Sequence, residues 1–256
     1  IKQCKQYKKT RKGILPDMIE LFNENTQNGS EKNSESDDIK EYGASTIKTD
    51  RGNIHCLTII GQIEGHMILP PQNKSTKYEH ILPQLVYVEE TSDIDGMLIL
   101  LNTVGGDVEA GLAIAEMLSS MKKPTVSLVL GGGHSIGVPL AVSADYSFIA
   151  RSATMTVHPI RTNGLVIGVP QSFEYLWKIQ ERITDFVERN SNISHDSFME
   201  LLLNNADIAN DIGTVLFGKD AVECGLINEI GGLSEALEKL YSLIDEHKKS
   251  KTSTDK

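Results

Sequence analysis

The sequence predicts an α/β fold built from parallel βαβ units. From residue 54 onward, short runs of β-branched and apolar residues alternate with longer segments of helical periodicity. Three of the short runs lead directly into glycine-rich or turn-forming segments, as strands do at the carboxyl edge of an open α/β sheet. With 256 residues and a hydrophobic content of 39%, the chain can bury a substantial core.

The individual elements follow this alternation in order. Residues 54–60 form the first predicted core strand, which ends at Gly61. The helix expected over residues 109–121 has an apolar face and ends at a Lys-Lys-Pro sequence, which is a common helix stop. The other expected elements are a helix at 81–89, strands at 97–101 and 125–130, a helix at 137–143, strands at 146–150 and 154–158, a long helix at 173–187 and a strand at 215–217.

Composition divides the chain into three parts. Residues 23–50 are dominated by Asn, Ser, Thr, Glu, Asp and Lys, which bury too little apolar area to offset the entropy lost on ordering. A Lys-rich stretch follows Leu243. We therefore predict a flexible polar N-terminal segment at 1–52, a folded domain at 53–245 and a charged, solvated tail at 246–256.

Charge and hydropathy exclude several classes of protein. Acidic residues (35) outnumber basic residues (25), and the net charge of −10 disfavours a nucleic-acid-binding protein. Gly, Pro or charge interrupts every apolar run before it reaches the roughly 20 residues of a membrane span, and no signal-peptide pattern is found. Cys4, Cys56 and Cys224 lack the spacing of a metal site. We expect a cytoplasmic protein with reduced thiols, no bound metal and no cofactor.

Three segments carry the residues of chemical interest. They are residues 102–107 (Asn-Thr-Val-Gly-Gly-Asp), 131–137 (Gly-Gly-Gly-His-Ser-Ile-Gly) and 156–159 (Thr-Val-His-Pro), each at the end of a predicted strand. Because the carboxyl ends of such strands meet at one crevice, the three segments can converge. Their glycines let the backbone approach a ligand and leave N–H groups facing it, although either glycine cluster alone is typical of an ordinary turn.

Ser135 is the candidate nucleophile. It lies at a predicted strand-to-helix turn between glycines, a setting that exposes a hydroxyl to an incoming carbonyl. Residues 133–137 also fit the G-x-S-x-G elbow of α/β-hydrolase esterases, and that class needs a histidine late in the chain. His195 and His247 follow no predicted strand, whereas His158 ends one. We therefore favour His158 as general base and the order Ser, His, Asp.

Together these motifs resemble those of the ClpP-like serine peptidases. The matching features, in family order, are the Gly105-Gly106 turn, the Ser135 turn, His158 on its strand, the long helix near Trp177 and a late helix at 221–227. The resemblance extends over residues 54–243 and is most specific at 53–59 and 131–139. It implies a ClpP/crotonase-like superhelix of repeated βαβ units, assembly into a homo-oligomeric ring and a link to protein translocation or secretion.

The resemblance also implies a function and roles for single residues. The substrates would be peptides or unfolded proteins. Ser135 attacks the scissile carbonyl, His158 takes its proton and passes it to the leaving amine, and an aspartate fixes the imidazole tautomer. The amides of Gly105 and Ile136 form the oxyanion hole, and the strand at Gly105-Gly106 holds extended peptide by β-augmentation.

Two acids compete for the third catalytic position. Counted back from residues 225–227, the family aspartate falls on Gly213 without a gap. Asp211 needs a shift of two residues and Asp207 a shift of six, although the spacing of Asp207 from His158 is closer to that of the family. We favour Asp211 and keep Asp207 as the alternative. A helix-end or solvated carboxylate is the non-catalytic interpretation of either acid.

The sequence departs from the family pattern at several places. His134 stands where the family has a small residue, Pro159 directly follows His158, and residues 69–75 resemble an insertion. The N-terminal part also lacks the family's axial-loop signature. The insertion and the missing signature argue against a standard Clp-type ATPase partner, so the expected endopeptidase is either ATP-independent or ATPase-assisted.

Other functions compete with the endopeptidase. A non-proteolytic scaffold would keep the ring fold and bind partner proteins through its surface. A crotonase-type acyl-CoA enzyme also holds an oxyanion with backbone amides, but it needs no serine with its own histidine. The order of the triad residues disfavours an α/β-hydrolase esterase. A complete Ser-His-Asp set argues against the non-proteolytic scaffold.

Overall fold

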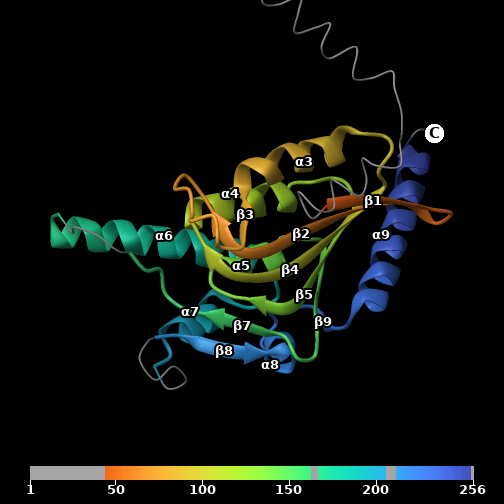
Figure 1. The fold of residues 1–256 in the computed structure, drawn as a ribbon. Helices are drawn as coiled ribbons and strands as arrows, with labels where there is room; N and C mark the ends of the chain where they lie inside the picture. Colours follow the sequence, from red (N-terminus) through yellow and green to blue (C-terminus); the bar gives the residue numbers. More distant parts are fainter. Residues whose placement is uncertain (1–43, 163–166, 206–211, 255–256) are drawn as a thin grey trace, which may run out of the picture. The chain divides into compact units, whose positions relative to one another are not determined.

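A mostly parallel sheet forms the centre of the protein (Figure 1). The computed structural model describes residues 44–162, 167–205 and 212–254. Along the main path the strand order is β1-β2-β4-β5-β6-β9, with only β1 antiparallel to its neighbour. These strands are β1 (Ala44–Thr49), β2 (Gly52–Glu64), β4 (Gly96–Gly106), β5 (Thr125–Gly133), β6 (Tyr146–Ile149) and β9 (Glu229–Ile230).

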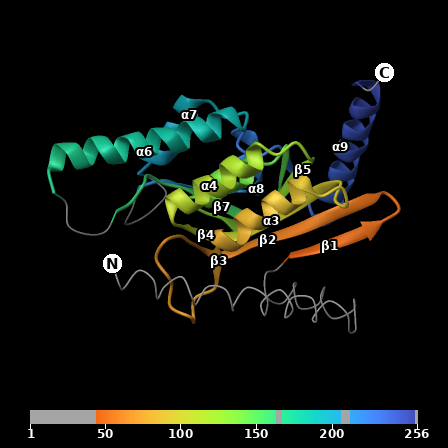
Figure 2. The same cartoon turned by 90° about the horizontal axis from the view of Figure 1, so that it is seen from above.

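Helices bury both faces of this sheet (Figures 1 and 2). On β4, Met97 and Ile99 belong to the core on one face, whereas Leu98 packs with Leu240 on the other. A strand covered on both sides needs a continuous apolar run, and β4 begins with one. The helices of the first face include α3 (Tyr78–Glu90), α4 (Val108–Ser119) and α5 (Gly137–Val142), and α9 (Leu233–Thr254) covers the second.

A separate antiparallel ribbon lies beside the main sheet. β7 (Thr154–Val157) pairs along its length with β8 (Thr214–Phe217) but meets β5 at one bridge, Gly132 to Thr154. Figure 1 shows the ribbon under the sheet and the far end of α6 projecting from the body. The remaining elements are β3 (Ser75–Lys77), α6 (Val169–Arg189), α7 (His195–Leu203) and α8 (Gly218–Glu223).

The predicted alternation of strands and helices is confirmed. Each element expected between residues 54 and 217 is present, with ends that differ by a few residues. The parallel pairing of β2 with β4 and of β4 with β5 gives the expected βαβ units. No helix in the described ranges is long and apolar enough to cross a membrane.

Regular structure extends beyond the predicted domain at both ends. β1 lies inside the segment predicted to be flexible, because its β-branched residues pair with the edge of β2 and Thr49 Oγ1 lies 3.1 Å from the hydroxyl of Tyr241. Residues 1–43 lie outside the described residues. The predicted solvated tail is helical to Thr254, and Lys248 Nζ forms an ion pair with Asp95 at 2.8 Å.

The polar stretch after α6 contains a helix that the sequence analysis did not predict. α7 begins after Ser194, whose hydroxyl accepts a hydrogen bond from the Ser197 N–H, and Asp196 lies in its first turn. These are ordinary start signals for a helix. Phe198 and Leu202 bury one side of α7 against the core.

Candidate active site

The three glycine-rich or turn-forming segments meet at a cleft of about 430 Å³. β4, β5 and β7 deliver these segments from their carboxyl ends, and α6 and α7 form the opposite wall. The cleft is lined by the predicted site residues Gly105, Gly106, Ser135, Ile136 and His158, and also by Gln62, Val104, Val108, Val138, Pro139, Val157, Ile160, Arg161, Gln180, Ile183, Phe198 and Leu202.

Ser135 lies in a strained turn held from two sides. Its φ of 57° is in the left-handed region, which a non-glycine residue rarely adopts. The Ser135 N–H donates to the carbonyl of Thr156 at 2.8 Å, and the preceding N–H of His134 donates to the carbonyl of Thr103 at 3.1 Å. The turn is thus fixed between β4 and β7, as a nucleophile elbow requires.

The Ser135 side chain packs against the glycine turn of β4. A Cβ added at Gly105 would lie 2.6 Å from Ser135 Cβ, and the φ of Gly105 is +88°. Only glycine fits this position for both reasons. The Ser135 hydroxyl forms no hydrogen bond within the described ranges, so it is free to act on a molecule in the cleft.

The two predicted oxyanion donors are not equivalent. The N–H of Ile136 has no hydrogen-bond partner among the described residues. The N–H of Gly105 donates to Thr103 Oγ1 at 3.0 Å, and this hydroxyl donates in turn to the Gly61 carbonyl at 2.6 Å. The Ile136 N–H is therefore available to a ligand. The Gly105 N–H can bind a substrate oxygen only if it gives up its hydrogen bond to Thr103 Oγ1.

His158 has the tautomer that a general base needs. Its Nδ1 lies 2.7 Å from the carbonyl oxygen of Pro159, which can only accept, so Nδ1 carries the proton and Nε2 keeps its lone pair. No hydrogen bond joins His158 to Ser135 within the described part of the chain. Such contacts are often long before substrate binds.

Gly213, the residue before β8, packs against His158. At Gly213 a Cβ would come within 2.4 Å of the Val157 carbonyl oxygen and 2.8 Å of His158 Cβ, and φ is +137°. No side chain fits there, so the ungapped position of the family aspartate is closed in this chain. Asp211 and Asp207, the two predicted candidates, lie outside the described residues.

The His134 side chain does not line the cleft. Its Nδ1 lies 2.9 Å from Thr156 Oγ1, and the ring lies over Gly132 rather than lining the cleft. Burial, and then the charge that His158 can carry, lower the pKa of His134. The ring is therefore neutral at pH 7 and helps to hold the turn between β5 and β7.

Sequence reasoning missed the residues that α6 and α7 contribute. Gln180 is 5% exposed and accepts a hydrogen bond from the Ile160 N–H at 2.9 Å through Oε1, while its buried Nε2 has no partner among the described residues. The position of Gln180 among the apolar residues of the predicted helix at 173–187 is the feature of the sequence that could have indicated it. Phe198 and Leu202 belong to α7, which was not predicted.

Comparison with known proteins identifies the family. Residues 50–233 match the Clp protease family. The chain belongs to this family. It is 61% identical over 208 residues to the translocation-enhancing protein TepA of Halalkalibacterium halodurans, covering 81% of each chain. It is 27% identical over 157 residues to an ATP-dependent Clp protease proteolytic subunit of Lactococcus lactis, covering 59% of this chain and 74% of the relative.

A solved structure supports the fold. A ClpP1 mutant from Listeria monocytogenes superposes with a TM-score of 0.57 at 21% identity, covering 71% of this chain and 94% of the other. The predicted ClpP-like α/β fold is therefore confirmed, as is the family resemblance carried by residues 53–59 and 131–139.

The strain at Ser135 leads to a stability prediction. We expect Ser135→Gly to be more stable than Ser135→Ala by about 0.5–1 kcal/mol, because the left-handed conformation costs a non-glycine residue roughly 1–2 kcal/mol and the flexibility of unfolded glycine offsets part of that gain. Urea unfolding of the two variants measures the difference. Equal midpoints would show that the turn stores no strain.

Proposed function

We propose that this Clp-family chain is a serine endopeptidase in which Ser135 is the nucleophile and His158 the general base. One observation carries the proposal: a free serine hydroxyl, an imidazole with its Nε2 unbonded among the described residues and an available Ile136 N–H share one cleft. Membership of the Clp protease family supports a peptidase over other hydrolases.

The chemistry follows from these three groups. Ser135 Oγ bonds to the scissile carbonyl carbon while its proton passes to His158 Nε2. The imidazolium then protonates the leaving amine as the C–N bond breaks, and water hydrolyses the acyl-enzyme with the same base. The Ile136 N–H donates to the oxyanion, and the Gly105 N–H joins it because a charged oxygen accepts more strongly than the Thr103 hydroxyl. Each oxyanion donor contributes about 3 kcal/mol.

The cleft suits a short stretch of extended polypeptide. Its volume of about 430 Å³ lies at the lower end of ligand-site volumes. The backbone at Gly105 and Gly106 offers strand-like pairing to peptide. The unpartnered Nε2 of Gln180 offers a donor to a substrate carbonyl, and leaving this buried group unbonded is costly in the free protein. Peptides and unfolded proteins are the substrates that fit.

A non-proteolytic scaffold is the second candidate. Two observations favour it: the missing hydrogen bond between Ser135 and His158 in the described residues, and the engagement of the Gly105 N–H by Thr103. Under either function, the name of the 61% identical relative supports a link to protein translocation, and we propose a cytoplasmic location. A Clp-type ATPase partner is supported by the name of the Lactococcus relative alone.

The first functional test removes the nucleophile. Ser135→Ala should lower hydrolysis of a fluorogenic peptide at least about a thousandfold and abolish labelling by a fluorophosphonate probe, with an unchanged fold. Ser119→Ala, at the exposed end of α4, is the matched control and should keep both signals. A wild-type chain that neither cleaves nor labels is a scaffold, and a Ser135→Ala variant that still cleaves excludes the mechanism.

The second test separates the two acids. We propose Asp211 as the residue that stabilises protonated His158, with Asp207 as the alternative. Asp211→Asn should lower the turnover number by orders of magnitude with little change in melting temperature, whereas Asp207→Asn should be near normal. The reverse result would assign the role to Asp207. If both variants stay active, the Pro159 carbonyl suffices to orient the imidazole and the enzyme works as a dyad.

The projecting half of α6 supports assembly into a ring. Phe173 and Trp177 stack with their ring centroids 6.2 Å apart, yet they are 64% and 41% exposed, and Val169 and Tyr175 nearby are 71% and 62% exposed. Val169, Phe173 and Trp177 are spaced four residues apart and so share one face of α6, and an exposed apolar face of this kind marks an interaction site. A second copy of the chain is the occupant we propose, in keeping with the closed symmetry of most homo-oligomers.

Assembly can be tested on this surface directly. The chain should sediment as a closed oligomer at micromolar concentration, and Phe173→Ser should shift it towards smaller species by removing an exposed aromatic ring. Glu174→Gln, the adjacent exposed position on α6, is the control and should sediment like the wild type. A monomeric wild type would rule out the ring.

A further inference from the structure

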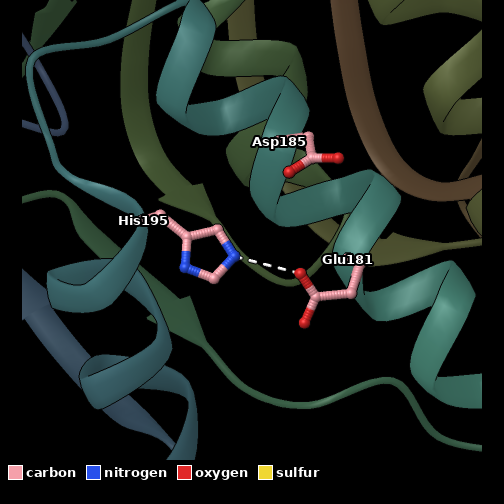
Figure 3. A group of neighbouring side chains, drawn as sticks. All are labelled: Glu181, Asp185 and His195. Atoms are coloured by element: carbon pink, nitrogen blue, oxygen red, sulfur yellow. Dashed lines mark hydrogen bonds and ion pairs between the residues drawn. The ribbon is translucent and has the colours of Figure 1, made fainter.

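Three potential metal ligands converge where α6 meets α7, outside the cleft (Figure 3). Glu181 and Asp185 lie one helical turn apart on α6, and His195 is the first residue of α7. One ligand atom from each of the three side chains lies within 4.8 Å of the other two. The candidate site therefore joins two elements that a short connection links.

One pair of these ligand atoms already has nearly the spacing of a zinc site. His195 Nε2 lies 3.0 Å from Glu181 Oε2. Ligand atoms about 2.0–2.1 Å from a tetrahedral Zn²⁺ lie roughly 3.3 Å apart, so this pair needs little adjustment. The Asp185 ligand atom lies within 4.8 Å of the other two, and its exposed side chain is free to rotate towards them.

The local charge also favours a cation. Within the described residues, His195 is the one basic side chain paired with Glu181, and Asp185 has no hydrogen-bond or ion-pair partner. The arginines of α6 are engaged elsewhere: Arg182 pairs with Glu109 and Arg189 with Glu116, both on α4. Two carboxylates beside one histidine therefore keep a net negative charge.

A further carboxylate lies near the other ring nitrogen of the histidine. His195 Nδ1 lies 3.6 Å from Asp196 Oδ1, on the side of the ring away from Glu181. At this distance the two groups form no hydrogen bond, but a small shift of the exposed Asp196 side chain would let it accept from Nδ1 and leave Nε2 for a metal, as in carboxylate–histidine–zinc arrangements. The backbone N–H of His195 donates a separate hydrogen bond to Glu188 Oε1 at 3.1 Å.

We propose that Glu181, Asp185 and His195 form a Zn²⁺ site that ties α6 to α7. An imidazole and two carboxylates are ligands that zinc accepts, and water completes the coordination. Both helices wall the cleft, through Gln180 and Ile183 on α6 and Phe198 and Leu202 on α7. A bound ion thus fixes the position of one wall element relative to the other, whether or not the chain is a peptidase.

The test measures Zn²⁺ affinity directly. The full chain competes with a chromogenic chelator for Zn²⁺ at about pH 8. This pH is chosen because the hydrogen bond to Glu181 raises the pKa of His195, and Zn²⁺ must displace the imidazole proton in order to bind. The wild type should bind one ion, and His195→Ala and Asp185→Asn should each weaken binding more than tenfold. Co²⁺ bound at the same site should give a spectrum without a thiolate charge-transfer band.

Glu188→Gln is the matched control. Like Asp185→Asn, it removes one negative charge from α6, and the glutamine keeps an acceptor for the backbone N–H of His195. The Zn²⁺ affinity of this variant should therefore stay within a few-fold of that of the wild type. Equal weakening by Asp185→Asn and Glu188→Gln would show diffuse attraction to an acidic surface and overturn the site. Failure of the wild type to bind, or a thiolate band that assigns binding to a cysteine, would also overturn it.

Discussion

Two neighbouring backbone hydrogen bonds hold the Ser135 turn, and the geometry of the cleft depends on them. One joins His134 to the Thr103 carbonyl of β4, and the other joins Ser135 to the Thr156 carbonyl of β7. Together they keep Ser135 in a conformation that an L-residue would otherwise leave, at a cost of roughly 1–2 kcal/mol. They also bring the turn against Gly105, where a single methyl group would collide with it.

Much of the fold was predictable because the central strands are buried on both faces. Such strands need uninterrupted apolar runs, and the helices between them need an apolar face, so the alternation is visible in the sequence. β1 and the end of α9 were missed because tertiary contacts decide them. Thr49 contacts Tyr241, 192 residues along the chain, and Lys248 contacts Asp95, which is also far from it in sequence. No local pattern announces contacts of that range.

The candidate site also contains some residues that the sequence predicted and others that it did not. Ser135, His158 and the glycine turn lie in short motifs at strand ends, so sequence reasoning found them together. The hydroxyl of Thr103 and the amide of Gln180 act through partners on other elements, which a linear pattern does not identify. The third catalytic acid stays a prediction, although the closed position at Gly213 explains why no aspartate matches the family without a shift.

The ribbon of β7 and β8 holds His158 in place relative to Ser135. Ser135 follows β5 of the main sheet, whereas His158 follows β7 of the ribbon. The bridge between Gly132 and Thr154 and the hydrogen bond from the Ser135 N–H to the Thr156 carbonyl join these two parts. Met155 of β7 and Leu216 of β8 also pack in the same apolar core as the sheet, so the alignment of the proposed nucleophile and base depends on that shared core as well. A substitution that loosens this shared core should therefore lower the melting temperature and misalign the Ser135 and His158 side chains together, so stability and any activity of the cleft are coupled properties of this molecule.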